Sequence, residues 1–152
     1  MVLIIATTRF NNQTFQENKR WRETNLPNGC IYKVPIQIAT TIPQGARLFV
    51  LEMNNTTNQI EGIGYTIKQL RYDYPAPIYE DRTYNRYTYV GRHRINREDL
   101  LKKNEFILKE LEDHLFKGKG NMKRGQSITR LPRKRCLPQY YEYMMELFNL
   151  DN

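Results

Sequence analysis

The sequence predicts a mixed α+β fold, and three observations support that prediction. A continuous apolar run over residues 2–8 is typical of a central buried strand. Two β-rich segments, 47–53 and 59–68, flank a polar stretch and predict a hairpin. An amphipathic helix is expected directly after Asn96. Because strands and helices do not alternate regularly along the chain, a parallel α/β sheet is not expected.

The first helix is expected soon after the opening strand. Thr14 and Glu17 fit a capping box in which Thr14 is the N-cap, and the Pro- and Gly-containing stretch 25–29 should end the helix. Residues 30–38 look extended. Pro35 has no backbone N–H to donate, so it confines this strand to an edge or a bulge.

The second strand of the predicted hairpin carries Gly62 and Gly64 on one face, because side chains alternate along a strand. Paired small residues permit sharp coiling of a small barrel or the close approach of another backbone. After an irregular Tyr- and Pro-rich stretch over 71–86, we expect one further strand over 87–95.

Two helices are expected in the C-terminal third. Asn96 can cap the first, and acidic Glu98 and Asp99 lie in its first turn, where the helix dipole favours them. Gly118 should end this helix, and Pro138 should open the last one. The apolar stripe of the first helix is Leu100, Ile107, Leu108, Leu111 and Leu115. The residues of the last helix expected to pack on the body are Tyr141, Met144, Met145 and Phe148.

One short segment carries the whole net charge of +8. Residues 117–135 contain eight basic side chains and no acidic one, which leaves 16 basic and 16 acidic side chains in the rest of the chain. Such a stretch is the electrostatic footprint of a phosphate-backbone partner, and its small residues let backbone N–H groups approach phosphates. These small residues are Gly118, Gly120, Gly125 and Ser127. The alternative interpretation is a solvated tail or a localisation signal.

Residues 71–97 combine six of the eleven tyrosines with six arginines. Aromatic rings stack on bases and guanidinium groups pair with phosphates, so this mixture suits single-stranded nucleic acid. The alternative is that the tyrosines only cover a small sheet. Trp21 likewise has two interpretations: an anchor in the core or at its rim, or one wall of an aromatic cage for a methylated base or a cationic ring.

The residues expected of common enzymes are not arranged for catalysis. Cys30 and Cys136 cannot form a disulfide scaffold or a four-ligand zinc site alone, and His93 and His114 have no metal-ligand spacing. The sequence has no Gly-x-Ser-x-Gly elbow and no phosphate-binding loop ending in Lys-Ser/Thr. We therefore expect a non-enzymatic protein without a cofactor or metal.

Two fragments resemble the motifs that name the GIY-YIG nucleases. They are Gly-Cys-Ile-Tyr at 29–32 and Tyr-Val-Gly-Arg at 89–92. In that family the motifs lie on adjacent strands a short loop apart, whereas some 57 residues separate them here. Tyr89, Arg92 and Glu98 would be the parts of such a nuclease, which is a minor alternative.

Residues 42–53, with their Pro/Gly turn and apolar strand, and the Gly pair in 60–64 resemble the PUA-like superfamily, which includes PUA, EVE, ASCH and YTH domains. The resemblance implies a small mixed β-barrel of about five strands with flanking helices and a basic C-terminal segment. The barrel and a packed helix would occupy 1–116, and the basic segment and last helix, packed on the same domain, 117–152. Segments 84–95 and 123–130 are also similar to uncharacterised proteins of large DNA viruses.

What the superfamily implies is binding: an RNA-binding module that, in its narrower form, reads a modified nucleotide or a methylated cap. YTH domains use several tryptophans for this, so Tyr or Phe would supply the other walls here. The candidate base-stacking and pocket residues are Trp21, Tyr84, Tyr87 and Tyr89. The candidate phosphate contacts are Arg92, Arg94, Lys123, Arg124, Arg130, Arg133, Lys134 and Arg135.

The main alternative is a protein-interaction subunit whose basic run docks an acidic partner and whose residues 140–150 present an apolar helix to a groove. In either case no apolar run approaches the roughly 18 residues of a membrane span, and no basic leader precedes the first strand. We expect an intracellular protein of the cytoplasm or nucleus, including that of a virus-infected host cell, with no membrane partner.

Overall fold

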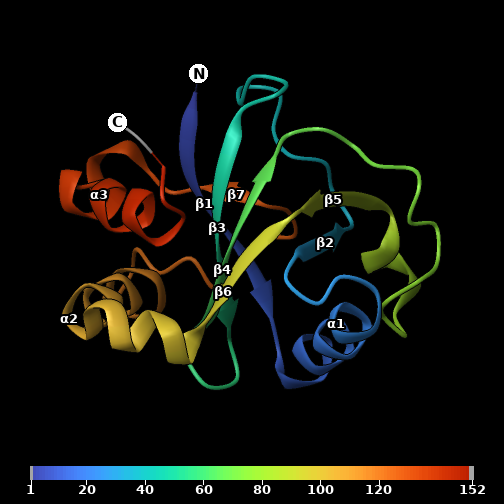
Figure 1. Cartoon of the computed structure of the whole chain (residues 1–152), viewed down its shortest axis with the longest axis horizontal. Helices are drawn as coiled ribbons and strands as arrows, with labels where there is room; N and C mark the ends of the chain where they lie inside the picture. Colours follow the sequence, from blue (N-terminus) through green and yellow to red (C-terminus); the bar gives the residue numbers. More distant parts are fainter. Residues whose placement is uncertain (1, 151–152) are drawn as a thin grey trace.

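The computed structural model describes residues 2–150 and consists of two β-sheets with helices on both sides (Figure 1). The strands are β1 (Leu3–Phe10), β2 (Cys30–Val34), β3 (Arg47–Asn54), β4 (Gln59–Ile67), β5 (Tyr87–Gly91), β6 (His93–Asn96) and β7 (Thr129–Arg130). The helices are α1 (Asn12–Asn25), α2 (Arg97–Phe116) and α3 (Pro138–Leu147), with short 3-10 turns η1 (Arg82–Asn85) and η2 (Arg133–Arg135). The expected α+β class is confirmed.

The larger sheet has the strand order β6-β4-β3-β1-β7, and the smaller one pairs β2 with β5. Strands β1 and β3 are parallel, whereas the other pairs are antiparallel. The expected closed barrel is therefore wrong. The physical reason lies at Arg92, where the single strand expected over 87–95 breaks: β5 joins the small sheet and β6 joins the large one. The chain thus passes from the small sheet to the large sheet at Arg92, and the two sheets remain separate.

The large sheet buries both of its faces. Figure 1 shows α2 and α3 covering one face, and α1 with the β2/β5 pair on the other. Alternate residues of the central strands serve the two sides: Ile4 and Leu48 belong to the core under α1 and β2/β5, and Ile5 and Phe49 to the core under α2 and α3. The continuous apolar run of β1 thus reflects a strand covered on both faces, as expected.

The two sheets meet at Gly64 of β4. A Cβ on Gly64 would fall against the Tyr32 hydroxyl and within 2.7 Å of the Cys30 sulfur, and a Cβ on Gly62 would meet the Arg94 guanidinium. The hydroxyl of Thr66 donates to the Val90 carbonyl at 2.6 Å, which ties the sheets directly. The glycine pair therefore leaves room for side chains: Tyr32 and Cys30 at Gly64, and Arg94 at Gly62.

The helix caps follow local signals with one correction. Asn96 caps α2, as expected, and accepts from the Asp99 N–H at 3.0 Å. The N-cap of α1 is Asn11 rather than Thr14, because Asn11 and Thr14 form the reciprocal capping box themselves. The chain turns into helix as soon as β1 ends, three residues earlier than Thr14 alone indicates.

Helix α3 is part of the same body as α2. Tyr140, Tyr143 and Met144 are buried in the cluster that also contains Leu108 and Leu111. Of the residues expected to pack, only Met144 is fully buried, and the other three are half-buried: Tyr141, Met145 and Phe148. Because the apolar side of α3 packs on the large sheet and α2, the helix does not present a free apolar face to a partner groove.

Within residues 2–150, no helix is both long enough and apolar enough to cross a membrane.

Candidate functional site

A pocket of about 420 Å³ lies at the carboxyl end of β1, where β2 and two loops from distant parts of the chain converge. The first strand, the start of α1 and the turn after β3 contribute Thr8, Arg9, Phe10, Asn11, Thr14 and Asn55. Strand β2, the residue after it and the Tyr- and Pro-rich stretch 71–86 contribute Tyr32, Lys33, Val34, Pro35, Tyr79 and Tyr84. The basic segment contributes Lys123, Arg124, Gly125, Gln126 and Ser127. The pocket thus joins Tyr84 with Lys123 and Arg124, three of the residues expected to contact nucleic acid.

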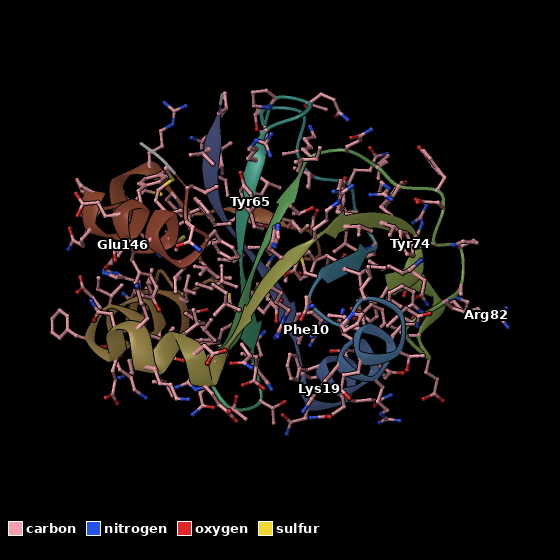
Figure 2. All side chains as sticks on the ribbon, in the orientation of Figure 1. Phe10, Lys19, Tyr65, Tyr74, Arg82 and Glu146 are labelled. Atoms are coloured by element: carbon pink, nitrogen blue, oxygen red, sulfur yellow. The ribbon has the colours of Figure 1, made fainter. Side chains whose placement is uncertain are left out.

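Aromatic side chains form one part of the wall. Phe10, labelled in Figure 2, packs edge-on against Phe15 of α1 with ring centroids 5.7 Å apart. Tyr79 is buried and accepts a hydrogen bond from the Asn18 amide at 3.0 Å. Tyr84 lies edge-on to it at 6.5 Å and is 38% exposed. The ring of Tyr84 is therefore the aromatic surface that a ligand can reach.

The charged side chains that line the pocket are all cationic: Arg9, Lys33, Lys123 and Arg124. No acidic residue is among the described residues that line it. Burial lowers the pKa of the Lys33 ammonium. Burial also lowers the pKa of Arg9 to about 10, which leaves Arg9 charged at neutral pH. An accumulation of positive charge with no carboxylate beside it favours an anionic ligand.

Arg9 holds the basic wall of the pocket in place. Its Nε donates to the Gly125 carbonyl at 3.0 Å, and its Nη1 donates to the Met122 carbonyl at 3.1 Å. Its Nη2 donates to the Ser127 carbonyl and, at 3.0 Å, to the Thr129 hydroxyl. One side chain of β1 therefore fixes a loop that lies more than 110 residues away in the sequence.

Two polar atoms at the pocket have no hydrogen-bond partner in the described part of the chain. They are Asn55 Oδ1 and Ser127 Oγ, both shielded from solvent. The amide nitrogen of Asn55 donates to the Lys123 carbonyl at 2.8 Å, so its oxygen remains as a hydrogen-bond acceptor. Buried polar atoms are normally paired, so two unpaired ones on residues that line the pocket are unusual.

The other expected stacking residues lie away from the pocket. Tyr89 is 1% exposed, and its hydroxyl accepts from the Ile38 N–H at 3.1 Å. Tyr87 is half-buried, with the Arg86 guanidinium 5.6 Å from its ring centroid. Trp21, in α1, packs edge-on against Tyr74 with ring centroids 5.8 Å apart. Trp21 has the rim position that its alternative interpretation describes, and Tyr89 offers no face to a base.

Arg94 is also unavailable to a phosphate. Its guanidinium pairs with the Glu52 carboxylate at 2.6 Å, and the two side chains are 8% and 1% exposed. Burial alone raises the pKa of Glu52, but the charge and hydrogen bonds of Arg94 hold it below the ordinary 4.5. The expectation that Arg94 contacts phosphate is therefore wrong, because a buried counter-ion occupies it.

The remaining predicted phosphate contacts lie outside the pocket. Arg92 is exposed between β5 and β6, Arg130 is half-buried on β7, and Arg135 donates to the Gly120 carbonyl. Arg133 and Lys134 are exposed in η2. None of these five side chains is among the residues that line the pocket.

The two nuclease-like fragments do lie on adjacent strands. Cys30 pairs with Gly91, and Tyr32 with Tyr89, across β2 and β5. Both tyrosines are only 1% exposed, and the Tyr32 hydroxyl already donates to Glu52 at 2.6 Å. Burial raises the pKa of Tyr32 well above its ordinary value. The strand pairing fits the motif, but neither hydroxyl can reach a phosphodiester in solvent.

Sequence reasoning missed Arg9, Lys33, Asn55, Phe10 and Tyr79 as pocket residues. The signal that could have found Arg9 is its position, a cation directly at the end of a buried strand with no acidic neighbour in sequence. A comparison of the chain with models of protein families, with curated proteins and with solved structures finds no match.

Proposed function

We propose that this protein is a non-enzymatic RNA-binding module and that its pocket holds one nucleotide. The observation that supports this most directly is the pairing of an accessible tyrosine ring with an all-cationic wall around a single cavity. The base stacks on Tyr84, and the phosphates lie toward Lys123 and Arg124. A volume of about 420 Å³ falls within the range of small-ligand sites, so one nucleotide is a reasonable occupant.

The same proposal includes a PUA-like relation in an open form, with two sheets in place of a closed barrel. The order of an opening strand, a Trp-bearing helix and a central hairpin supports it. The narrower form of the proposal is recognition of a modified nucleotide or a methylated cap. In that form the methyl group would cover part of the exposed Tyr84 ring, where burying apolar surface is favourable.

The experiment is fluorescence-anisotropy binding to RNAs of about ten nucleotides that are unmodified, methylated on adenine or capped, with a DNA of the same sequence. We expect affinity to fall steeply between about 50 and 200 mM salt. Tyr84→Ala should weaken binding by about 1–3 kcal/mol at both salt concentrations, because a stacking ring is lost.

The charge variant Lys123→Gln with Arg124→Gln should lower affinity for every sequence and reduce the salt slope by about two phosphate contacts. Its matched control is Lys102→Gln with Lys103→Gln, which removes two exposed cations from α2 on the other side of the sheet. Equal losses in the two double variants would contradict the pocket. Salt-independent binding, or binding unaffected by Tyr84→Ala, would contradict nucleotide recognition and favour the acidic protein partner.

A further inference from the structure

The loop 123–127 is oriented by side chains that bind its carbonyl groups. The Arg9 guanidinium donates to the carbonyls of Met122, Gly125 and Ser127. It also donates to Thr7 and to the Thr129 hydroxyl. The Asn55 amide donates to the Lys123 carbonyl at 2.8 Å. Four carbonyl oxygens of one short segment are therefore turned toward side chains of the protein body.

The consequence for the backbone N–H groups follows from peptide geometry. In a planar trans peptide, the C=O of one residue and the N–H of the next point in opposite directions. Because the carbonyls of Lys123 and Gly125 point inward, the N–H groups of Arg124 and Gln126 point away from the protein body. Within residues 2–150, the backbone N–H groups of 124–127 have no hydrogen-bond partner.

The charge behind these donors is uncompensated. Arg9 bonds only to carbonyl and hydroxyl oxygens, and no carboxylate pairs with it among the described residues. Its donors are already engaged, so its role toward a ligand is electrostatic and positional. Unpartnered backbone N–H groups close to a buried cation favour an oxyanion. The unpartnered Ser127 hydroxyl lies in the same loop.

We propose that residues 124–127 are a backbone phosphate-binding loop, in which a phosphate group accepts hydrogen bonds from the N–H groups of Arg124 and Gln126 and from the Ser127 hydroxyl. Arg9 is the positioning residue that sets the loop. The inference rests on the proposed function, because the phosphate is that of the nucleotide held in the pocket. It differs from ordinary basic-patch binding because it assigns the phosphate of the bound nucleotide to the backbone, while the Lys123 and Arg124 side chains contact the neighbouring phosphates of a longer RNA.

The experiment is titration of the full chain, followed by nitrogen–proton correlation spectra at constant ionic strength. The probes are a 5′-nucleoside monophosphate, the corresponding nucleoside and inorganic phosphate. We expect the monophosphate to move the amide protons of Arg124 and Gln126 downfield, and the nucleoside to leave them in place. Inorganic phosphate should produce the same shifts at higher concentration, which distinguishes the phosphate group from the rest of the nucleotide.

Three variants separate backbone from side-chain binding. Arg124→Gln removes a charge but keeps the backbone N–H, so the phosphate-induced shifts should persist. Arg9→Lys cannot reproduce the fork of donors to three carbonyls, so the shifts should disappear. Ser127→Ala should weaken the monophosphate about tenfold, the effect of one hydrogen bond to a charged group. Circular dichroism checks that each variant is folded, and Ser127→Ala still tests the loop if Arg9→Lys does not fold.

Loss of the shifts in Arg124→Gln, with their retention in Ser127→Ala, would overturn the inference, because the phosphate would then be held by a side chain. RNA binding without any shift at residues 124–127 would overturn it too, and would leave the proposed function standing. Shifts with phosphate but no RNA binding would instead reject the proposed function and retain the loop.

Discussion

The two faces of the five-stranded sheet bury similar numbers of apolar side chains but differ in what else they bury. Under α2 and α3 the core is almost wholly aliphatic and aromatic, and its charged exception is Glu112, which pairs with Arg97 at 2.5 Å near the start of α2. Under α1 and the β2/β5 pair, the core encloses the Glu52–Arg94 ion pair and a set of hydrogen-bonded polar side chains. The pocket lies on this second side.

The polar groups of the second side are connected to the pocket wall. The Tyr32 hydroxyl donates to Glu52, and Asn18 donates to the Tyr79 hydroxyl, so two ring positions at the pocket depend on buried polar partners. Arg22 donates to the Asn18 amide oxygen at 2.7 Å. Such hydrogen bonds are directional and apolar packing is not. The comparison teaches that one face mainly stabilises the fold, while the other fixes where particular side chains lie.

The largest expected effect is that of Glu52→Gln. The change leaves the buried Arg94 guanidinium without its counter-ion, so the free energy of unfolding should fall by about 3–5 kcal/mol. Chemical denaturation at neutral pH measures it. Replacing both partners, Glu52→Met with Arg94→Met, should recover part of the loss, because no unpaired charge remains. A double variant as unstable as Glu52→Gln would show that the pair acts through shape rather than charge.

The pH dependence sharpens this result. The folded-state pKa of Glu52 is below its ordinary value of 4.5, so the stabilisation is complete above that value and is lost as the pH falls through the folded-state pKa. The difference in stability between the wild type and Glu52→Gln should therefore be constant near neutral pH and shrink below about pH 4.5. A difference that stayed unchanged into strong acid would contradict an ionised Glu52.

A smaller effect is expected where the two sheets meet. Gly64→Ala places a methyl group against Tyr32 and Cys30, which should cost about 1–3 kcal/mol through overpacking and should weaken RNA binding by moving Tyr32 at the pocket. Gly45→Ala is the matched control: it has no atom within 4 Å but a φ of +83°, so it should cost about 1–2 kcal/mol through backbone strain alone. Chemical denaturation measures the stability of the two variants, and anisotropy measures their RNA affinity. An equal loss of RNA affinity in both variants would contradict a specific effect of Gly64 on the pocket.

How far the sequence predicts this molecule depends on the range of each signal. The hairpin expected over 47–53 and 59–68 appears as Arg47–Asn54 and Gln59–Ile67, and the cap at Asn96 is observed, because both signals lie within a few residues. The break at Arg92 has no such local mark, since it depends on which strand each half finds as a partner. Residues beside the break look like one alternating strand in the sequence.

The candidate site is the least predictable part for the same reason. Lys123, Arg124 and Tyr84 could be proposed from composition, because basic and aromatic residues are what nucleic acids require. The sequence marks Arg9 only as a cation at the end of a strand, because its hydrogen-bond partners are carbonyl groups more than 110 residues away. Arg94 looks in sequence like any other arginine of its region, and only the fold places it against Glu52.

The smallest expected effect gives the sharpest test of the two faces, because two similar caps lie on opposite sides. Asn11 caps α1 and lines the pocket, and its side chain accepts from the Thr14 N–H at 2.8 Å. Asn96 caps α2 through the Asp99 N–H at 3.0 Å. Alanine at either position should lower the free energy of unfolding by about 1 kcal/mol.

The two cap variants should nevertheless differ in RNA affinity. Asn11→Ala loosens the start of α1 at the pocket and should weaken binding, whereas Asn96→Ala should leave the dissociation constant unchanged. Anisotropy is measured on both variants at a temperature where both are folded. The two variants lose similar stability, so a difference in RNA affinity reports the local change at the pocket. If both variants lost affinity in proportion to their loss of stability, binding would depend on the fold as a whole. That result would contradict the assignment of the pocket to one face of the sheet.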